Sequence, residues 1–204
     1  MSTDFLSTVS VFSNLSNEEL SNVDKLTTSR DYPKGSMVIL EEEYGDKIFI
    51  IKKGTVKITR VNDEGKEVIL ALLGSSDIFG EMAILDGEVR SANALAQEHC
   101  ELLTFTRDDF INLLENNFKI SLGLMGELAK RLRKSDMQIE ALSLSDAEHR
   151  IGVSILNLAE EMGVIRHGMV TIDNLPFQQD IANMAGTSRE TVSRILKMFE
   201  ERNM

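Results

Sequence analysis

The stretch GTSRETVSRILKMF, residues 186–199, decides the fold of the C-terminal region of this chain. At 100° per residue, the angle of an α-helix, its polar and apolar side chains fall on separate arcs. The stretch therefore predicts an amphipathic helix with one face in a core. The polar arc holds Arg189, Glu190, Ser193, Arg194 and Lys197, and the apolar arc holds Val192, Ile195, Leu196 and Phe199.

A second helix is expected just before this one, with a tight break at residues 185–187. Two helices that cross steeply need a small residue where they touch, here Ala182, and a permissive backbone in the turn, here Gly186. The spacing predicts a helix-turn-helix whose second helix enters the major groove of DNA; two unrelated helices are the alternative. The apolar anchors at the expected offsets are Ile181, Val192 and Ile195.

Two of the candidate DNA contacts, Glu190 and Arg194, have a structural alternative. Glu190 can accept from a cytosine amino group, or it can close a capping box with Thr187. Arg194 can fork onto guanine O6 and N7, or it can pair with Glu190 one turn earlier. Thr187 and Ser188, at the start of the helix, are natural phosphate contacts.

The charge of the chain is acidic and unevenly distributed. The formal net charge is −11; residues 1–126 hold 12 Lys and Arg against 21 Asp and Glu, and residues 127–204 hold 10 against 12. Neither half is basic, which argues mildly against nonspecific nucleic-acid binding. A local basic face on the predicted C-terminal helix is still compatible with DNA, provided that the acidic surface faces elsewhere.

The single cysteine and the scattered histidines exclude several classes of site. With Cys100 alone, the chain forms no internal disulfide, Cys-ligated iron–sulfur cluster or Cys-based zinc site, and Cys100 itself is expected in a buried strand. His99, His149 and His167 have no metal-ligand spacing, so no metal site is expected. No apolar run approaches the roughly 20 residues that span a bilayer, and no leader is evident, so a cytoplasmic protein without membrane contact is expected.

Residues 33–107 are typical of short antiparallel strands separated by turns. Segments such as KIFIIKKGTVKITRV are β-branched and partly alternating, and residues 63–65 form an expected hairpin turn. Glycines recur about every ten residues, which favours a compact barrel or roll. A short helix is expected before the strands, over residues 17–26, with Asn17 as its N-cap.

A long helical region without proline runs from about residue 107 to residue 144, and MVTI, residues 169–172, reads as a short strand after it. A narrow apolar seam in the long region predicts a dimerisation helix, with Ser135 as a polar break; the alternative is a helix packed on its own domain. The expected domains are a sensor at 1–107, a connecting and dimerisation helix at 108–143 and a DNA-binding domain at 144–204. The seam consists of Leu124, Leu128, Leu132, Ser135, Ile139 and Leu142.

Taken together, these motifs resemble the CRP/FNR family of bacterial transcription regulators over nearly the whole chain. The segments GDKIFIIKKGTVKI and FGEMAILDGEVRSA resemble the cyclic-nucleotide-binding β-roll, LAKRLRKSD the dimer helix and GTSRETVSRILKMFEE the recognition helix. The resemblance implies an α+β fold: an antiparallel β-roll, a long dimerising helix and a C-terminal winged helix-turn-helix. The wing would follow Met204, so it is expected to be missing from this sequence.

The resemblance also implies an operator. Arg189, Glu190 and Arg194 match the base-reading residues of the catabolite-regulator branch, which favours a palindrome with TGTGA-like half-sites. Ser193 stands where that branch has glycine and resembles the Glu-x-x-Ser-Arg arrangement of the FNR branch. The TGA core of the half-site is therefore a firmer expectation than the outer bases.

The segment FGEMAILDGEVRSA resembles the phosphate-binding cassette of cyclic-nucleotide domains. In it Glu81 can accept from a ribose hydroxyl, Arg90 can neutralise a cyclic phosphate, and Gly80 and Ser91 can give close contacts. By the same resemblance, Ser135 and Asp136 of the dimer helix meet the purine, where Asp136 replaces a second hydroxyl and can accept from an adenine amino group.

The ligand is open between cAMP or another cyclic nucleotide, a different ligand, and an empty roll in which Glu81 and Arg90 pair with each other. The sequence is thus interpreted as a homodimeric, sequence-specific DNA-binding regulator with RNA polymerase as a further partner. The alternatives are an effector-independent regulator and a ligand-binding module that no longer holds DNA. A cupin-like enzyme is rejected because residues 1–98 contain no histidine, and no catalytic residues are assigned.

Overall fold

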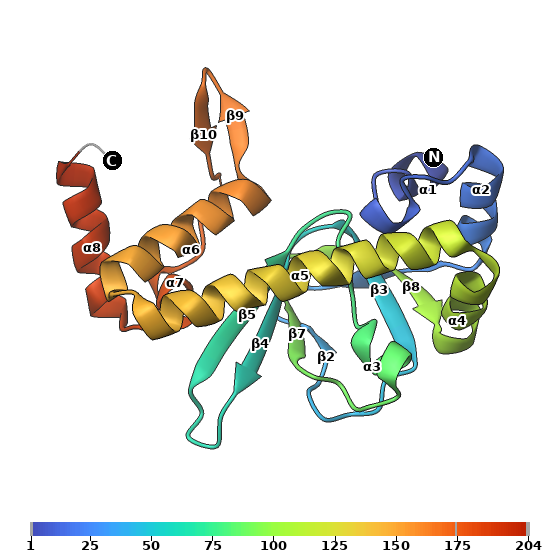
Figure 1. The fold of residues 1–204 in the computed structure, drawn as a ribbon, viewed down its shortest axis with the longest axis horizontal. Coiled ribbons are helices and arrows are strands. Elements are labelled where there is room, and N and C mark those ends of the chain that lie inside the picture. The colour runs from blue at the N-terminus through green and yellow to red at the C-terminus, as the bar shows by residue number, and fades with distance from the viewer. Residues whose placement is uncertain (1, 174, 203–204) are drawn as a thin grey trace. The chain divides into compact units, whose positions relative to one another are not determined.

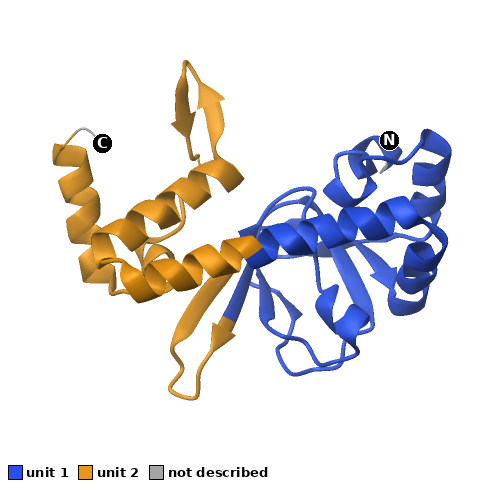
Figure 2. Cartoon of the chain, viewed as in Figure 1, with its two compact units in different colours: residues 1–59, 72–132 blue, residues 60–71, 133–204 orange. Residues whose placement is uncertain are grey.

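The computed structural model describes residues 2–173 and 175–202. The chain divides into two compact units (Figure 2). The first contains residues 1–59 and 72–132, and the second contains residues 60–71 and 133–204. The expected boundaries at residues 107 and 143 remain predictions, and the expected wing after Met204 lies outside the described residues.

The first unit begins with three short helical segments that cover one side of a β-roll (Figure 1). They are α1 (Ser2–Leu6), the 3-10 turn η1 (Ser10–Phe12) and α2 (Asn17–Lys25). The cap of α2 is Ser16 rather than the expected Asn17. The Ser16 hydroxyl accepts from the Glu19 backbone N–H, and Glu19 accepts in return from the Ser16 N–H at 2.6 Å. This reciprocal capping box satisfies two donors, which Asn17 as a first helical residue would not do.

The roll consists of two four-stranded antiparallel sheets, as predicted. One sheet has the order β1-β8-β3-β6, and the other has the order β2-β7-β4-β5. Gly65, at a φ of +76°, stands in the predicted turn between β4 and β5. The strands are β1 (Thr28–Tyr32), β2 (Met37–Ile39), β3 (Lys47–Lys53), β4 (Val56–Val61), β5 (Glu67–Leu73), β6 (Ile78–Phe79), β7 (Asn93–Ala96) and β8 (Cys100–Thr106).

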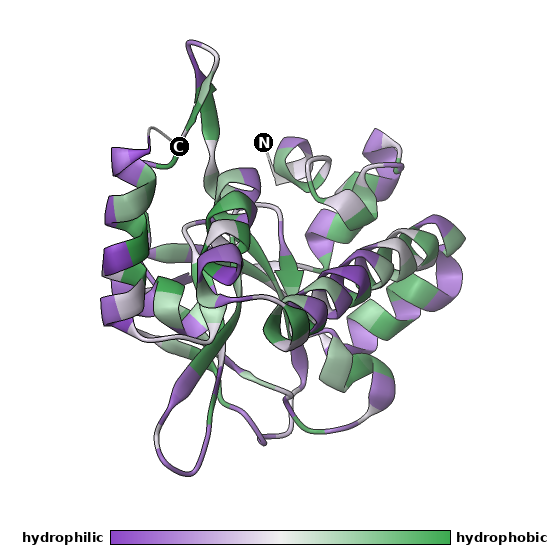
Figure 3. Ribbon diagram, turned by 60° about the vertical axis from the view of Figure 1, so that its left-hand side comes forward, coloured by the Kyte–Doolittle hydropathy of each residue, from purple (hydrophilic) through white to green (hydrophobic). Residues whose placement is uncertain are grey.

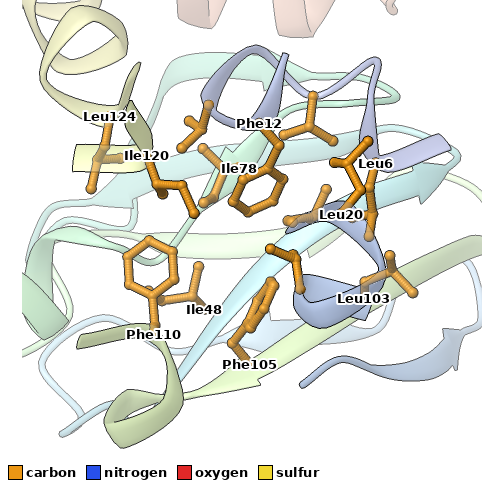
Figure 4. Packing of buried hydrophobic residues seen from close by; sticks show 14 of the residues in the cluster. Leu6, Phe12, Leu20, Ile48, Ile78, Leu103, Phe105, Phe110, Ile120 and Leu124 are labelled. Atoms are coloured by element: carbon orange, nitrogen blue, oxygen red, sulfur yellow. The ribbon is translucent and has the colours of Figure 1, made fainter. Parts of the chain in front are cut away.

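Strand β3 is buried on both faces and supplies two cores. Because side chains alternate along a strand, Ile48 and Ile50 enter one core while Phe49 and Ile51 enter the other. The first core also takes side chains from the N-terminal helices, from α4 (Arg107–Asn116) and from the start of α5 (Phe118–Leu144) (Figure 4). The roll and these helices therefore share one hydrophobic core.

Helix α5 is the long helix that the sequence predicted, but its buried side differs from the expected seam. Leu124 is buried in the first core and Leu128 packs against that core, whereas Leu132 is exposed. Ile120, Leu124 and Leu128 follow one another at four-residue spacing, so they form one stripe against the roll. The N-terminal part of the expected seam thus follows the alternative, a helix packed on its own domain.

The second unit holds the C-terminal helices. Asp146 caps α6 (Ala147–Met162) by accepting from the His149 N–H at 2.9 Å. The predicted strand is β10 (Met169–Thr171), which pairs with the unpredicted β9 (Val164–Arg166). Helices α7 (Gln178–Ala185) and α8 (Arg189–Glu201) follow, and hydrophilic and hydrophobic residues alternate along α8 (Figure 3). Within residues 2–173 and 175–202, no helix has the length and apolar character of a membrane span.

Candidate nucleotide site and DNA-reading helix

The cassette predicted from the sequence forms a tight loop after β6. Gly80 has a φ of +80°, and the short helix α3 (Met82–Asp86) begins directly after Glu81 and ends at Gly87. A Cβ atom at Gly80 would lie 2.9 Å from Arg90 Nη1 and 3.1 Å from Ile39 Cδ1. The glycine is therefore needed both for its backbone conformation and for the close approach of the arginine.

Arg90 is the buried cation of this loop, with only 6 % of its surface exposed. Its guanidinium donates to the carbonyl oxygens of Gly80, at 2.6 Å, and of Lys47, at 2.7 Å. Burial lowers the pKa of Arg90, while the negative charges of Asp46 and Glu81 raise it. A guanidinium nevertheless stays protonated in proteins, so the loop carries a desolvated positive charge suited to an anion.

Gly45 makes room for that guanidinium and was not predicted as a site residue. A Cβ atom at Gly45 would lie 2.0 Å from both Cζ and Nε of Arg90. The sequence signal for it is weak, because Gly45 in EEEYGD reads as one of several turn glycines. Gly45 and Gly80, which lie in separate loops, are thus both packed closely against the guanidinium of Arg90.

Glu81 is almost fully buried and accepts from Arg131 of α5, with Oε1 and Nη1 2.7 Å apart. A second guanidinium nitrogen of Arg131 donates to the Ile78 carbonyl. The Glu81–Arg90 pair considered from the sequence is therefore not the contact that holds Glu81. Arg131 was missed, although its place one helical turn before Ser135 in KRLRKSD was the available signal.

The other predicted ligand residues are accessible. Ser91 is exposed, and its hydroxyl donates to the Met82 sulfur at 3.8 Å. Ser135 and Asp136 are exposed on α5 within the second compact unit. Their contact with a purine stays a prediction.

The predicted helix-turn-helix is formed by α7 and α8. Gly186 takes a left-handed conformation, with φ +60° and ψ +46°, and the Thr187 N–H donates to the Ala182 carbonyl at 3.0 Å. The expected anchors of both helices are buried, so the turn and the underside of α8 are fixed. They are Ile181, Val192 and Ile195, with Ala182 at the helix contact, and Ala185 is buried beside them.

The start of α8 tests the capping-box alternative for Glu190. Ser188 is the N-cap and accepts from the Thr191 N–H at 3.2 Å, so Thr187 does not form the capping box with Glu190. The Glu190 carboxylate accepts from its own backbone N–H and from Ser188; these bonds, and then the charge of Arg189, lower its pKa. Glu190 is thus an exposed, ionised acceptor at the N-terminal end of the helix.

The predicted DNA-contacting residues share an exposed face, apart from Thr187, which is half-buried in the turn. The Nζ atom of Lys197 lies 4.0 Å from Oε1 of Glu201, which is one turn further along α8. This face combines fork-shaped and point-charge donors with one acceptor, a combination suited to base edges and phosphates. The exposed residues are Ser188, Arg189, Glu190, Ser193, Arg194 and Lys197.

Arg150 of α6 is a positioning residue that sequence reasoning missed. Its Nε donates to the Ala185 carbonyl at 2.9 Å, and its Nη1 donates to the Ser145 carbonyl at 2.7 Å. The guanidinium thereby ties the end of α7 to the end of the long helix. A charged side chain in the apolar run HRIGVSIL was the available signal.

Cys100 lies in β8 and is fully buried, which confirms the prediction of a buried strand residue. Its thiol donates to the Thr55 carbonyl at 3.3 Å, and burial raises its pKa. Within the part of the chain that the structure describes, no cluster of three or more His, Cys, Asp or Glu residues could hold a metal ion.

Comparison with known proteins matches both halves of this arrangement. Residues 29–117 match the cyclic nucleotide-binding domain, and residues 149–204 match the Crp-like helix-turn-helix domain. Roll and helix-turn-helix together define the class, a DNA-binding regulator with a nucleotide-type sensor domain. The chain belongs to the CRP/FNR family of transcription regulators.

Three known proteins illustrate the similarity. The Cyclic AMP receptor protein of Thermus thermophilus is 34% identical over 191 residues, which are 94% of this chain and 85% of that protein. The cAMP-activated global transcriptional regulator CRP of Haemophilus influenzae is 34% identical over 177 residues, 85% of this chain and 77% of that protein. The crystal structure of the Thermus thermophilus Catabolite Activator Protein superposes with a TM-score of 0.61 at 33% identity, covering 95% of this chain and 87% of that one.

Proposed function

We propose that this regulator is a homodimer that binds cAMP in its β-roll and reads a palindrome of TGTGA-like half-sites with α8. The observation that carries the proposal is that one chain combines a buried guanidinium in a glycine-lined loop with an exposed polar face on α8 that holds two arginines, a lysine and a carboxylate. An effector-independent regulator, or one with a different ligand, is the alternative. The proposed partners, DNA and RNA polymerase, place this activity in the cytoplasm.

The residues of the cassette fit a cyclic phosphate. Arg90 would neutralise the single negative charge of the phosphodiester, and Glu81 would accept from the ribose 2′-hydroxyl. Gly45 and Gly80 leave the space around the guanidinium that any Cβ atom would fill. The names of two relatives, which refer to cAMP, support adenine as the base.

A binding experiment tests the ligand. Calorimetry with cAMP and cGMP should show saturable binding of cAMP to the wild-type chain. Arg90→Met should weaken it at least 100-fold, because charge-assisted bonds to the phosphate are lost. The matched control is Arg107→Met, which removes a guanidinium that donates to the Ala83 carbonyl at 3.4 Å and should leave the affinity within a factor of about three.

The face of α8 fits a sequence-specific contact with DNA. Arg189 and Arg194 would donate to guanine, and Glu190 would accept from a cytosine amino group. Ser193 would lie between these contacts and determine how strictly α8 discriminates among the outer bases of the half-site. Thr187, Ser188 and Lys197 would hold phosphates and so position the helix.

A titration of labelled duplexes tests this assignment. Replacing Arg189 and Arg194 together by Ala should cost at least about 30-fold in affinity for a TGTGA palindrome, since each bidentate contact to a base is worth roughly 1–3 kcal/mol. Lys197→Ala should weaken binding to specific and random duplexes alike and reduce the salt slope by about 1. If the double variant bound the palindrome as wild type does, Arg189 and Arg194 of α8 would not read the bases, and this assignment would be wrong; if the wild-type chain bound no duplex, the chain would be a ligand-binding module that no longer holds DNA.

Dimerisation would use the exposed side of α5, within residues 120–143. A parallel pair of these helices would place two helix-turn-helix modules on successive major grooves, about 34 Å apart along the DNA. The palindromic operator follows from that two-fold symmetry.

A further inference from the structure

Polar side chains link the cassette to the N-terminal segment within the first compact unit. They are Glu81 at the cassette, Arg131 and Glu127 on α5, and Ser10 at the start of η1. Each of them contacts the next, and the first is the proposed acceptor for a ribose hydroxyl. The N-terminal segment is thus connected to the ligand site by side chains that do not themselves reach the ligand.

Arg131 holds the buried Glu81 carboxylate at one end of this connection. Nη1 of the guanidinium donates to Oε1 of Glu81 at 2.7 Å, and Nη2 donates to the Ile78 carbonyl. A buried carboxylate needs a counter-charge in good geometry, so the orientation of this guanidinium determines where the Glu81 oxygens lie. Whatever holds Arg131 therefore also holds the acceptor for the ribose.

Glu127 contacts the remaining nitrogen of the same guanidinium from one helical turn earlier. Its Oε1 lies 3.9 Å from Arg131 Nε. Its other oxygen, Oε2, accepts from the Ser10 hydroxyl at 3.1 Å and lies 3.8 Å from Lys130 Nζ. The Glu127 side chain is only 19 % exposed, so solvent and salt screen its charge less than that of a surface carboxylate.

Close packing fixes the position of Ser10. The next two residues, Val11 and Phe12, are buried in the first core. A Cβ atom at Gly123, one turn before Glu127 on α5, would lie 2.9 Å from the Val11 carbonyl oxygen. The backbones of η1 and α5 therefore meet with no room for a side chain between them, and Ser10 reaches Glu127 from a rigidly packed segment.

We propose that Glu127 is a positioning residue for ribose recognition and that Ser10 supports it. Glu127 holds Nε of Arg131, Nη1 of Arg131 holds Oε1 of Glu81, and Oε2 of Glu81 would accept from the ribose 2′-hydroxyl. This inference rests on the proposed binding of cAMP, because the ribose supplies that hydroxyl. The N-terminal segment thereby contributes to ligand selectivity without touching the ligand.

Calorimetry of the full chain with cAMP and 2′-deoxy-cAMP tests this role. Wild type should bind the deoxy analogue at least about tenfold more weakly, since a hydrogen bond to a charged group is lost. Glu127→Gln keeps the shape of the side chain and an oxygen for Ser10 but removes the charge beside Arg131. It should weaken cAMP binding roughly three- to tenfold and hardly change the binding of the analogue, which has no hydroxyl for Glu81.

A second variant and a control accompany Glu127→Gln. Ser10→Ala keeps the charges of Glu127 and Arg131 and removes only the supporting hydroxyl, so it should lower the ratio of the two affinities by roughly two- to threefold. Glu115→Gln removes a carboxylate from an exposed position of α4 in the same unit and should leave the ratio unchanged. Thermal unfolding checks that each variant is folded.

A double-mutant cycle tests whether Glu127 acts through Arg131. Arg131→Lys keeps the positive charge but has no Nε–H and no planar fork. In that background Glu127→Gln should cause no further loss in the ratio of the two affinities, because the group that Glu127 holds is gone. An equal loss in both backgrounds would show that Glu127 does not act through the guanidinium and would refute the proposal.

The outcomes separate the positioning role from the proposed ligand. If wild type prefers cAMP to the analogue but Glu127→Gln keeps the wild-type ratio, or weakens both nucleotides equally, the positioning role is refuted and cAMP binding stands. If wild type binds the two equally well, Glu81 is not the ribose acceptor, and the role is refuted while cAMP binding again stands. If wild type binds neither nucleotide, the proposed ligand is refuted and the positioning role with it.

Discussion

Arg90 is buried, so its guanidinium needs both hydrogen-bond acceptors and space in the surrounding structure. A buried guanidinium costs free energy unless its donors are satisfied, and here two backbone carbonyls accept from it. Arginine suits this place because its planar fork can hold those carbonyls and still present a charge to a phosphate. The guanidinium of Arg90 also needs space, and Gly45 and Gly80 leave it because neither has a side chain.

Gly45→Ala tests this space. Gly45 is not among the glycines with a positive φ, so alanine is compatible with its backbone. The new Cβ, 2.0 Å from the guanidinium, should displace Arg90, weaken cAMP binding at least tenfold and lower the melting temperature. Calorimetry and thermal unfolding measure both effects.

Gly74→Ala is the matched control, because a Cβ atom there meets nothing within 4 Å. It should leave both quantities close to wild type. Unchanged cAMP affinity in Gly45→Ala would show that Arg90 is not the phosphate-binding group.

For single residues, the sequence indicates the chemistry of a side chain better than it indicates which residues that side chain contacts. Glu81 and Arg90 were predicted as site residues because FGEMAILDGEVRSA resembles a phosphate-binding cassette, in which their side chains suit a ribose hydroxyl and a phosphate. Gly45 and Arg131 were missed because the fold alone brings them to the cassette, across 45 and 50 residues of chain respectively. Ser16 was missed as a cap because Asn17 is equally suitable by residue type, and one residue of register separates them.

At the scale of elements, α5 carries two apolar stripes: one packs against the roll core, and we propose that the other forms the dimer. The sequence predicted the helix from its uninterrupted pattern, but several leucines spaced by three or four residues do not say which stripe meets the roll. The structure assigns Leu124 and Leu128 to the roll core and leaves Leu132 exposed.

Two alanine variants separate these stripes. Leu124→Ala should lower the free energy of unfolding by about 3 kcal/mol, because it removes a buried side chain from a packed core. Leu132→Ala should instead weaken the dimer, by roughly tenfold or more in its dissociation constant. Urea unfolding at several protein concentrations distinguishes the two; equal, concentration-independent losses would contradict the assignment.

Glu101 of β8 links the three strands β1, β3 and β8. Its Oε1 accepts from Lys52 Nζ at 2.6 Å and from Ser29 Oγ at 3.0 Å. The bond from Lys52 is the largest cause that lowers the pKa of Glu101 below its ordinary value of 4.5. A carboxylate with a lowered folded pKa stabilises the fold above its unfolded pKa and loses that contribution as the pH falls through the folded value.

Glu101→Gln should therefore lower the free energy of unfolding at pH 7 by about 0.5–1 kcal/mol, and the difference from wild type should shrink as the pH falls below 4.5. Denaturant unfolding at pH 7 and at pH values below 4.5 measures this. Glu88→Gln, in the exposed loop after α3, is the control and should differ little from wild type at any pH. A difference that grew toward low pH would contradict the sign.

For the whole molecule, the sequence predicted the order of the parts, and the domain boundaries expected at residues 107 and 143 stay predictions. Periodicity and turn residues indicated a roll, a long helix and a helix-turn-helix. The two compact units divide inside α5, after residue 132, and the second unit includes residues 60–71 of the β4–β5 hairpin. A long-range division of this kind has no local signal, because it depends on which surfaces pack together and not on composition.

Switching by cAMP, as proposed, requires that nucleotide binding and DNA binding be coupled. In such a coupling, cAMP changes the affinity for DNA by the same factor by which DNA changes the affinity for cAMP, typically about 5- to 150-fold. The acidic charge of the first 126 residues then poses no conflict with DNA binding, because α8 presents its own local face of Arg189, Arg194 and Lys197.

The most direct measurement is a titration of the full chain on a TGTGA palindrome, at one fixed salt concentration, with and without saturating cAMP. The account predicts at least about tenfold tighter binding with cAMP, and no response to cAMP in Arg90→Met. Equal affinity of the wild-type chain in both conditions would contradict the account.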